Sequence, residues 1–218
     1  ETISRDGLLA VKFDDAYHAD SLALQLRDQL LARDWSGEPE LAEALDIIAR
    51  WDGRASLDNH EAALSLMTYQ PIGTALFVGS APPDLADSFR AAVDTLLTHH
   101  GRLDPLWSEV NRLMRGDADV ALAGGPDTLR AVNSSPDGNG RLRMVSGDGL
   151  TLLVEWDADG RQRVEAVHQF GSSSDPQSPH YTDQMALFAE QGWRAIPMGE
   201  AAVRAAAVET YRPGARSQ

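Results

Sequence analysis

The chain has 218 residues and a formal net charge of −14 at pH 7, because 33 acidic residues face 19 basic ones. Nucleic-acid binding needs Lys and Arg to displace counterions from phosphates, and anionic membrane surfaces repel acidic proteins, so the charge argues against both as partners. The length and the 43% hydrophobic content suit a globular protein of one or two domains, while the absence of cysteine excludes disulfides, thiolate metal sites and a Cys nucleophile.

The start of the chain lacks the features of a complete precursor. Residues 1–7 contain neither an initiator Met nor a basic segment followed by an apolar one, as a secretion signal would. No apolar run reaches the roughly 18 residues that cross a bilayer. We therefore expect a processed or truncated piece of a longer protein.

Residues 1–115 are predicted to be a helical segment. Leu22, Leu26 and Leu30 recur at four-residue spacing, as on one face of a helix, and the acidic pair Asp14-Asp15 precedes the positive end of that helix.

A second helix is predicted to begin at Pro39, which suits a first turn. Leu41, Leu45 and Ile48 then share one apolar stripe, and Gly53 is expected to close the helix in a left-handed cap.

Three more helices are expected before residue 115. Asp58 with Glu61 resembles a capping box that opens the third helix. The punctuation at residues 82–84 precedes a fourth helix, which carries apolar residues at helical spacing and ends near Gly101. A short fifth helix is expected at 107–110.

Residues 116–218 are predicted to be a β-rich segment with a late helix. Gly, Pro, Asn and Ser cluster between 124 and 140, and the stretches between them are short. Strands at 150–156 and 164–170 flank the turn 157–160, which is a strong hairpin signal. The chain is therefore expected to be α+β, with mainly antiparallel sheet.

The late helix is predicted to start at Ser178 as N-cap, with Pro179 in its first turn. It would run through Met185 and Phe188 and stop at Gly192. The tryptophans fall at periodic or strand positions that favour the core.

The six histidines do not form a convincing metal site. His99 and His100 are adjacent and point about 100° apart on a helix, so they cannot easily bind one ion together. His168 lies in an expected strand, and His180 with Asp183 has helical i, i+3 spacing but no third ligand. Capping or buried hydrogen bonding is favoured, and we assign no metal and no cofactor.

Other candidate chemistry has a simpler structural explanation. The serines 172–174 lack a Walker lysine and any nucleophile elbow, so a plain loop is favoured. Paired acids suit acid–base chemistry or calcium binding, but the pair in the hairpin turn has His168 where a calcium loop needs Glu. The pairs are Asp14 with Asp15, Asp117 with Asp119, and Asp157 with Asp159.

One stretch resembles a known family. The run Ser178-Pro179-His180-Tyr181-Thr182-Asp183-Gln184, after a strand and a Gly/Ser loop, is similar to the late signature of the penicillin acylase family. Residues 48–53 are similar to a second trait of the family. Further segments, in the family's order, look most like its acyl-homoserine-lactone and aculeacin acylase branch; they are residues 107–112, 124–132, 148–149 and 154–157. The resemblance runs from about Gly7 to Met198.

The resemblance implies an N-terminal nucleophile hydrolase. In such enzymes a precursor cuts itself and exposes a Ser whose own α-amine acts as base. Glu1 supplies no hydroxyl, and Ser4 has no free α-amine. Asn111 and Arg112 do not match the family's oxyanion and site positions, which lie upstream. We assign no catalytic residue and leave the binding residues unknown.

The resemblance further implies that this is the C-terminal portion of an acylase β-chain, completing an αββα fold. Its partners would be the α-chain, the rest of the β-chain and a small N-acyl substrate, in the periplasm or outside a bacterium. Ser178, Pro179, His180, Tyr181, Asp183 and Gln184 would mainly be structural, through a helix cap and buried hydrogen bonds. Many relatives carry Gly-Gln-Ser-Gly where this chain has residues 171–175.

The leading hypothesis is thus an amide hydrolase acting on acyl-homoserine lactones or lipopeptides, with this chain inactive alone. A penicillin- or cephalosporin-type acylase is the enzymatic alternative. A non-catalytic binding module on the acylase scaffold, or an independent acidic α+β protein, are the alternatives from other classes.

Overall fold

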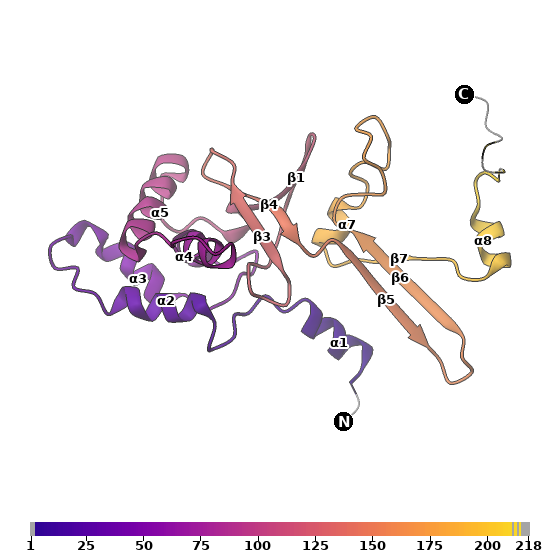
Figure 1. Cartoon of the computed structure of the whole chain (residues 1–218), viewed down its shortest axis with the longest axis horizontal. Coiled ribbons are helices and arrows are strands. Elements are labelled where there is room, and N and C mark those ends of the chain that lie inside the picture. Colours follow the sequence, from indigo (N-terminus) through magenta and orange to yellow (C-terminus); the bar gives the residue numbers. More distant parts are fainter. Residues whose placement is uncertain (1–2, 211, 213, 215–218) are drawn as a thin grey trace.

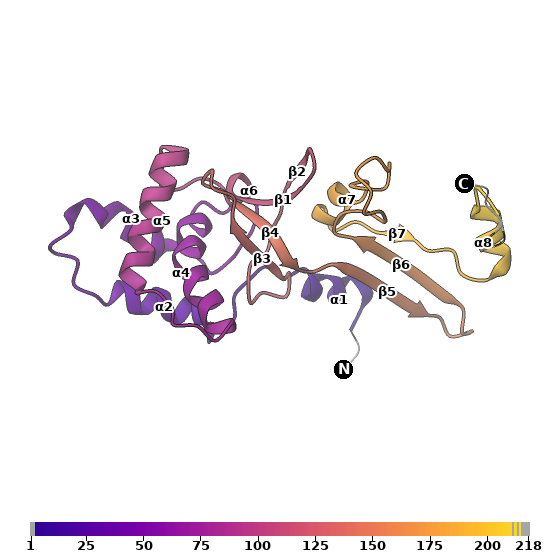
Figure 2. The ribbon, with the colours of Figure 1, turned by 45° about the horizontal axis from the view of Figure 1, so that its top comes forward.

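The computed structural model describes residues 3–210, 212 and 214. Helices gather at one end of the molecule, a four-stranded sheet lies in the middle, and a hairpin followed by the last helices lies at the other end (Figure 1; Figure 2). This succession of helices and then mixed and antiparallel sheets confirms the predicted α+β class.

The longest described helices, α4 and α5, have 16 residues each. Within the described residues, none of the helices combines the length and apolar character that a membrane crossing needs. The helices are α1 (Arg5–Lys12), α2 (Leu22–Leu31), the 3₁₀ turn η1 (Pro39–Leu41), α3 (Ala42–Arg50), α4 (Ala62–Phe77), α5 (Leu85–His100), α6 (Trp107–Val110), α7 (Met185–Ala189) and α8 (Glu200–Ala206).

The predicted first helix is present as α2, but its cap is Ser21, whose Oγ accepts a hydrogen bond from the backbone N–H of Leu24 at 3.4 Å. The prediction that Asp14 and Asp15 lie at its positive end was wrong. Both acids pair with Arg54, at 3.2 and 2.7 Å, because the segment before α2 crosses to the loop after α3.

The predicted second helix is present as η1 and α3, with Pro39 in the first turn and the apolar stripe facing the core. Gly53 adopts the expected left-handed conformation, at φ +76°, but it does not close the helix. α3 ends at Arg50 with Trp51 as its C-cap. The turn at Gly53 instead lets its carbonyl accept a hydrogen bond from the backbone N–H of Tyr17, at 2.8 Å.

The caps of α4 and α5 show one wrong and one confirmed prediction. The predicted capping box of Asp58 with Glu61 is absent, because Glu61 is itself the N-cap of α4 and its side chain makes no capping bond. Asn59 Oδ1 instead accepts from the backbone N–H groups of Glu61 and Ala62, at 2.9 and 2.8 Å. α5 begins at the cap Asp84 and ends at Gly101, which has φ +68°, as the sequence predicts. The short fifth helix is α6.

The larger core lies among α2–α6 and is built around aromatic rings. Trp51 and Trp107 are 1% exposed, and the Trp51 ring lies 5.4 Å from Tyr17 and 6.0 Å from Tyr69 between centroids. The prediction that the tryptophans are core residues was wrong for Trp156, which is 66% exposed.

The middle sheet has the order β2-β1-β4-β3, and its β1–β4 pair is parallel, so the sheet is mixed and not purely antiparallel. The second sheet is antiparallel, with the order β5-β6-β7. The strands are β1 (Asn111–Arg115), β2 (Ala118–Ala121), β3 (Val132–Pro136), β4 (Leu142–Gly147), β5 (Leu150–Trp156), β6 (Gln162–His168) and β7 (Arg194–Ala195). The sheet begins at Asn111, and the division of the chain after residue 115 stays a prediction.

The predicted hairpin is confirmed as β5 and β6. Asp157 shapes its turn, because Oδ1 accepts from the backbone N–H groups of Asp159 and Arg161, at 2.9 and 2.8 Å. A second, smaller core joins the middle sheet, β6 and α7; it consists of Leu113, Leu122, Val132, Met144, Val167, Met185 and Phe188.

A buried arginine, Arg130, contacts the segment after α1, the helix α7 and the turn before β5. Arg130 is 1% exposed, and its guanidinium lies 4.3 Å from the Phe188 ring and 5.2 Å from the Phe13 ring. It donates to the Phe188 carbonyl at 2.7 Å and pairs with Asp148 at 3.5 Å, while Lys12 also pairs with Asp148 at 2.6 Å. Burial lowers the pKa of Arg130, and Asp148 opposes that shift.

The helix α1 was not predicted, and it buries none of its residues. Ser4 caps it by accepting from the backbone N–H of Gly7 at 3.0 Å. Its Arg5 reaches across to the hairpin and pairs with both Glu155 and Glu165. Charge, more than apolar burial, attaches this helix to the sheet.

Two phenylalanines test where the helical core lies. Phe89 is fully buried and Phe77 is 91% exposed. We expect Phe89→Ala to lower the free energy of unfolding by about 3–5 kcal/mol, since it leaves a cavity. Phe77→Ala, the matched control, should change it by less than about 0.5 kcal/mol. Urea denaturation followed by circular dichroism measures both, and equal losses would contradict the assigned core.

The α1–hairpin contact predicts a dependence of stability on acid. Arg5, followed by Arg163, holds the pKa of Glu165 below its ordinary value, although partial burial opposes them. A carboxylate with a lowered pKa stabilises the fold above its unfolded pKa of about 4.3, and that stabilisation is lost as the pH falls through the folded pKa.

We therefore expect the urea midpoint of the unmodified protein to fall more steeply below about pH 4.3 than that of Arg5→Met. The control is Arg204→Met, whose pair with Glu200 is exposed on both sides and contributes little. Parallel pH profiles for the unmodified protein and Arg5→Met would show that this contact does not stabilise the fold.

Candidate functional site

The signature segment is a loop that joins β6 to α7, visible beside α7 in Figure 1. The predicted helix start at Ser178 and Pro179 was wrong, because residues 178–184 form turns and α7 begins at Met185. The Ser178 hydroxyl caps no helix, and instead accepts a hydrogen bond from the backbone N–H of His180 at 3.1 Å.

Gln184 holds this loop to the end of β6. It is 3% exposed, and its side-chain Oε1 accepts from the backbone N–H of His168 at 3.0 Å. Its Nε2 donates to the Ser172 hydroxyl at 3.1 Å, and its backbone N–H donates to the Phe170 carbonyl at 2.9 Å. One buried amide therefore fixes both ends of the loop.

His180 and Asp183 form a pair at the surface. His180 Nδ1 lies 2.9 Å from Asp183 Oδ2, and Arg194 lies 3.7 Å from the same oxygen. The expectation of buried hydrogen bonds was wrong, since the His180 side chain is 61% exposed and that of Asp183 27%. Gly171 is required beneath them, because a Cβ there would lie 2.2 Å from the His180 carbonyl oxygen and 2.7 Å from Asp183 Oδ1.

Arg115 stacks on the loop in a contact that was not predicted from the sequence. Its guanidinium lies 4.1 Å from the Tyr181 ring and 4.9 Å from the Phe170 ring, and donates to the Tyr181 carbonyl at 3.2 Å. The end of β1 thus presses on the signature loop. The spacing of Arg115 from Tyr181 in the chain hides this contact from any local pattern.

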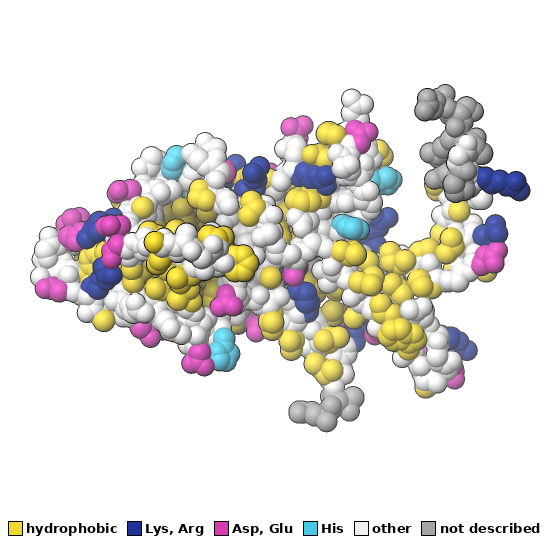
Figure 3. Space-filling view, in the orientation of Figure 1, with side chains coloured by type: hydrophobic (Ala, Val, Ile, Leu, Met, Phe, Trp, Pro, Cys, Tyr) yellow, Lys and Arg dark blue, Asp and Glu magenta, His cyan; other side chains and the backbone are white. Residues whose placement is uncertain are grey.

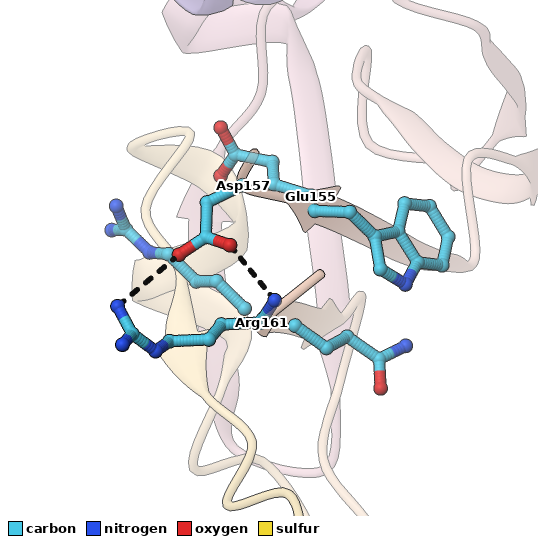
Figure 4. Close-up of a pocket in the computed structure, with 6 residues that line it drawn as sticks. Glu155, Asp157 and Arg161 are labelled. Carbon is cyan, nitrogen blue, oxygen red and sulfur yellow. Dashed lines mark hydrogen bonds and ion pairs between the residues drawn. The ribbon is translucent and has the colours of Figure 1, made fainter. Parts of the chain in front are cut away.

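The acid pair of the hairpin turn is structural. Figure 4 shows Asp157 bonded to Arg161 beside Glu155, at a shallow hollow of about 330 Å³. Asp119 pairs with Arg112 and Arg141, at 2.7 and 2.9 Å. Within the described part of the chain, no group of three His, Asp or Glu residues is placed to hold a metal ion.

The remaining candidates are engaged elsewhere in the fold. His100, at the end of α5, lies 3.0 Å from the Gly140 carbonyl. Asn111 is fully buried; its amide donates to the Leu122 carbonyl at 2.7 Å and accepts from the Ser134 hydroxyl at 2.8 Å. These contacts support the middle sheet and leave no free group directed at a ligand.

No Ser or Thr hydroxyl among the described residues is paired with a base as a serine nucleophile would be. Between residues 3 and 208, none of these hydroxyls hydrogen-bonds to a His or Lys side chain. Ser36 bonds to the Asp34 carboxylate in an exposed turn, through its backbone N–H and its hydroxyl, and both bonds lower the pKa of Asp34, which makes that carboxylate a weaker base. A serine nucleophile needs such a base, or its own α-amine, within hydrogen-bond reach. The described residues therefore place no hydroxyl beside a His or Lys base.

An apolar groove of about 550 Å³ lies between α4, α5 and β3. Apolar side chains gather over this end of the molecule in Figure 3. Its size and lining suit an apolar chain, and the polar groups beside it include Gln70, which donates to the Ser134 carbonyl. The groove can hold a ligand but has no reacting group, so it is not by itself an active site.

Comparison with known proteins gives a consistent family. A family model described as Penicillin amidase matches residues 1–205. An acyl-homoserine lactone acylase PvdQ of Pseudomonas fluorescens strain Pf-5 is 30% identical over 140 residues, which cover 63% of this chain and 18% of that protein. The same-named protein of strain Pf0-1 is 26% identical over 94% of this chain and 30% of its own length.

A third relative shows the same proportions. The acyl-homoserine lactone acylase PvdQ of Pseudomonas syringae pv. tomato is 24% identical over 93% of this chain and 30% of its own length. The chain therefore spans less than a third of the length of these relatives.

The buried amide of Gln184 gives a test of the signature loop. Gln184→Met keeps the size of the side chain but leaves the His168 N–H without its acceptor, and we expect a loss of about 1–3 kcal/mol in unfolding free energy. Gln177→Met, at an exposed position of the same loop, is the control and should be near neutral. Chemical denaturation measures the difference, and equal effects would contradict the role given to Gln184.

Proposed function

The chain belongs to the penicillin amidase family, and from this premise we propose that it is the C-terminal part of an acylase β-chain whose nucleophile lies in the rest of the protein. The observation that carries this proposal is the family match over residues 1–205 of a chain in whose described residues no Ser or Thr hydroxyl is hydrogen-bonded to a His or Lys side chain. The chain's own role is then to support a site built elsewhere.

The reaction we propose is hydrolysis of the amide bond of an N-acyl substrate. An N-terminal Ser of the remaining polypeptide attacks the amide carbonyl carbon, and its α-amine takes the hydroxyl proton. Oxyanion donors stabilise the tetrahedral intermediate, which expels the amine and leaves an acyl-enzyme. Water then releases the carboxylic acid and restores the serine.

The substrate class we propose is an N-acyl compound with an aliphatic tail, either an acyl-homoserine lactone or a lipopeptide. The names of the three relatives, all acyl-homoserine lactone acylases, support the former. We also propose a periplasmic or secreted location in a bacterium. Penicillin-type side-chain removal is the second candidate, because the matching family model carries that description.

The complete protein, including whatever precedes this chain, tests the function. We expect it to release free homoserine lactone from straight-chain acyl substrates faster than it cleaves phenylacetyl amides. Release is followed by chromatography coupled to mass spectrometry. The control replaces the residue exposed by self-cleavage with Ala, which should abolish release.

Three outcomes contradict parts of this proposal. Faster cleavage of phenylacetyl amides would favour the penicillin-type enzyme. No turnover of either class would contradict acylase activity. A processed chain that starts with a residue other than Ser, Thr or Cys would favour a non-catalytic binding module.

A further inference from the structure

One face of the β5-β6-β7 sheet is apolar and exposed along β5, whereas Val164 and Ala166 of β6, on the same face, are buried beside it. Side chains alternate along a strand, so every second residue of β5 lies on this face. Leu150, Leu152 and Trp156 are 57%, 55% and 66% exposed, and Val154 lies among them. Ile196, 40% exposed, joins them because its N–H bonds to the carbonyl of Val164, the partner of Val154. We call these five residues the hairpin face.

The opposite side of the same sheet is covered. Arg5 of α1 pairs there with Glu155 and Glu165, and Val167 is buried at 2% exposure in the smaller core with α7. Figure 3 shows apolar side chains gathered over the hairpin. A sheet that is covered on one face and exposes several large apolar side chains on the other lacks a partner layer.

The outer edge of β5 points to the same conclusion independently. β5 is the outer strand of its sheet among the described residues, and its pairing with β6 is unbroken over seven residues. Folded proteins protect such edges with charges, proline or bulges. β5 has no proline and no bulge, and its one charge, Glu155, is turned towards Arg5.

We propose that the remaining acylase polypeptide covers the hairpin face with an apolar sheet face and pairs a strand with the β5 edge. This inference rests on the proposed function, because it takes the partner to be the rest of that protein. The chain spans 18% to 30% of the length of three relatives, so most of their length is available to supply that layer. Two sheets packed face to face bury such residues in a layer about 10 Å thick.

The charge of the chain disfavours a second copy as the occupant. Each copy carries a formal net charge of −14, and two such copies repel one another when brought together. The five residues of the hairpin face carry no charge to offset that repulsion, and Arg194, on the same face by register, already pairs with Asp183 at 3.7 Å. The remaining acylase polypeptide, with an apolar surface of its own, is therefore a better partner for the hairpin face than a second copy.

Thiol protection in the complete protein tests the proposal. This chain has no cysteine, so Leu152→Cys and the control Ala158→Cys each introduce one at a known place. Ala158 is exposed in the turn of the same hairpin, and both positions lie in the tryptic peptide 144–161. Alkylation by iodoacetamide is read from the mass of that peptide, in the native protein and in urea.

We expect Leu152→Cys to react about 100-fold more slowly in the native protein than in urea, since reaction then needs local opening. Ala158→Cys should react within about tenfold of its rate in urea. Leu150→Cys repeats the test should Leu152→Cys fail to fold. Equal native rates at residues 152 and 158 would overturn the proposal.

Two further readouts separate this inference from others. Protection that disappears on dilution, together with a fall in native mass from dimer to monomer, would overturn it in favour of a second copy. Hydrolysis measured on the same samples tests the function separately: protection without hydrolysis supports the covered face and contradicts the acylase, whereas hydrolysis without protection does the reverse.

Discussion

The burial of Arg130 between two aromatic rings is the contact on which the arrangement of the chain depends most. A guanidinium out of water is tolerated only when its charge and donors are satisfied, and here Asp148, the Phe188 carbonyl and the rings of Phe13 and Phe188 do this together. These groups come from the segment after α1, the turn before β5, and α7. One charged side chain thereby orients the N-terminal helix, the middle sheet and the hairpin relative to one another.

The two ends of the molecule differ in how completely they are closed. The helical end has a core of its own, in which Trp51, Phe89 and Trp107 are almost fully buried. The hairpin end has α7 on one side and nothing over the hairpin face. Apolar surface that stays in water contributes nothing to stability, so the hairpin end is the part that gains most from a larger protein around it. This agrees with a chain that spans less than a third of its relatives.

Sequence patterns predicted those elements whose signals are local. The helix from Asp84 to Gly101 carries its own cap, stripe and left-handed glycine, and the hairpin carries its own turn. Predictions failed where tertiary contacts decide the local structure. Ser178 caps no helix, because the residues after it form turns and Gln184 bonds the end of that segment to His168 and Ser172. No sequence pattern predicted the burial of Arg130, since its side-chain partners lie from 18 to 117 residues away in the chain.

Backbone geometry accounts for two residues in and beside the signature, Gly171 and Gln184. Gly171 leaves room for the His180 carbonyl, which a Cβ would approach to 2.2 Å. Gln184 satisfies the backbone of His168 and the hydroxyl of Ser172 with one buried amide, and no apolar residue of that size offers both bonds. Few other residue types could replace Gly171 or Gln184, because each position must satisfy several contacts at once. A motif can thus identify a family through the backbone path that its loop requires, because the same path needs the same residues.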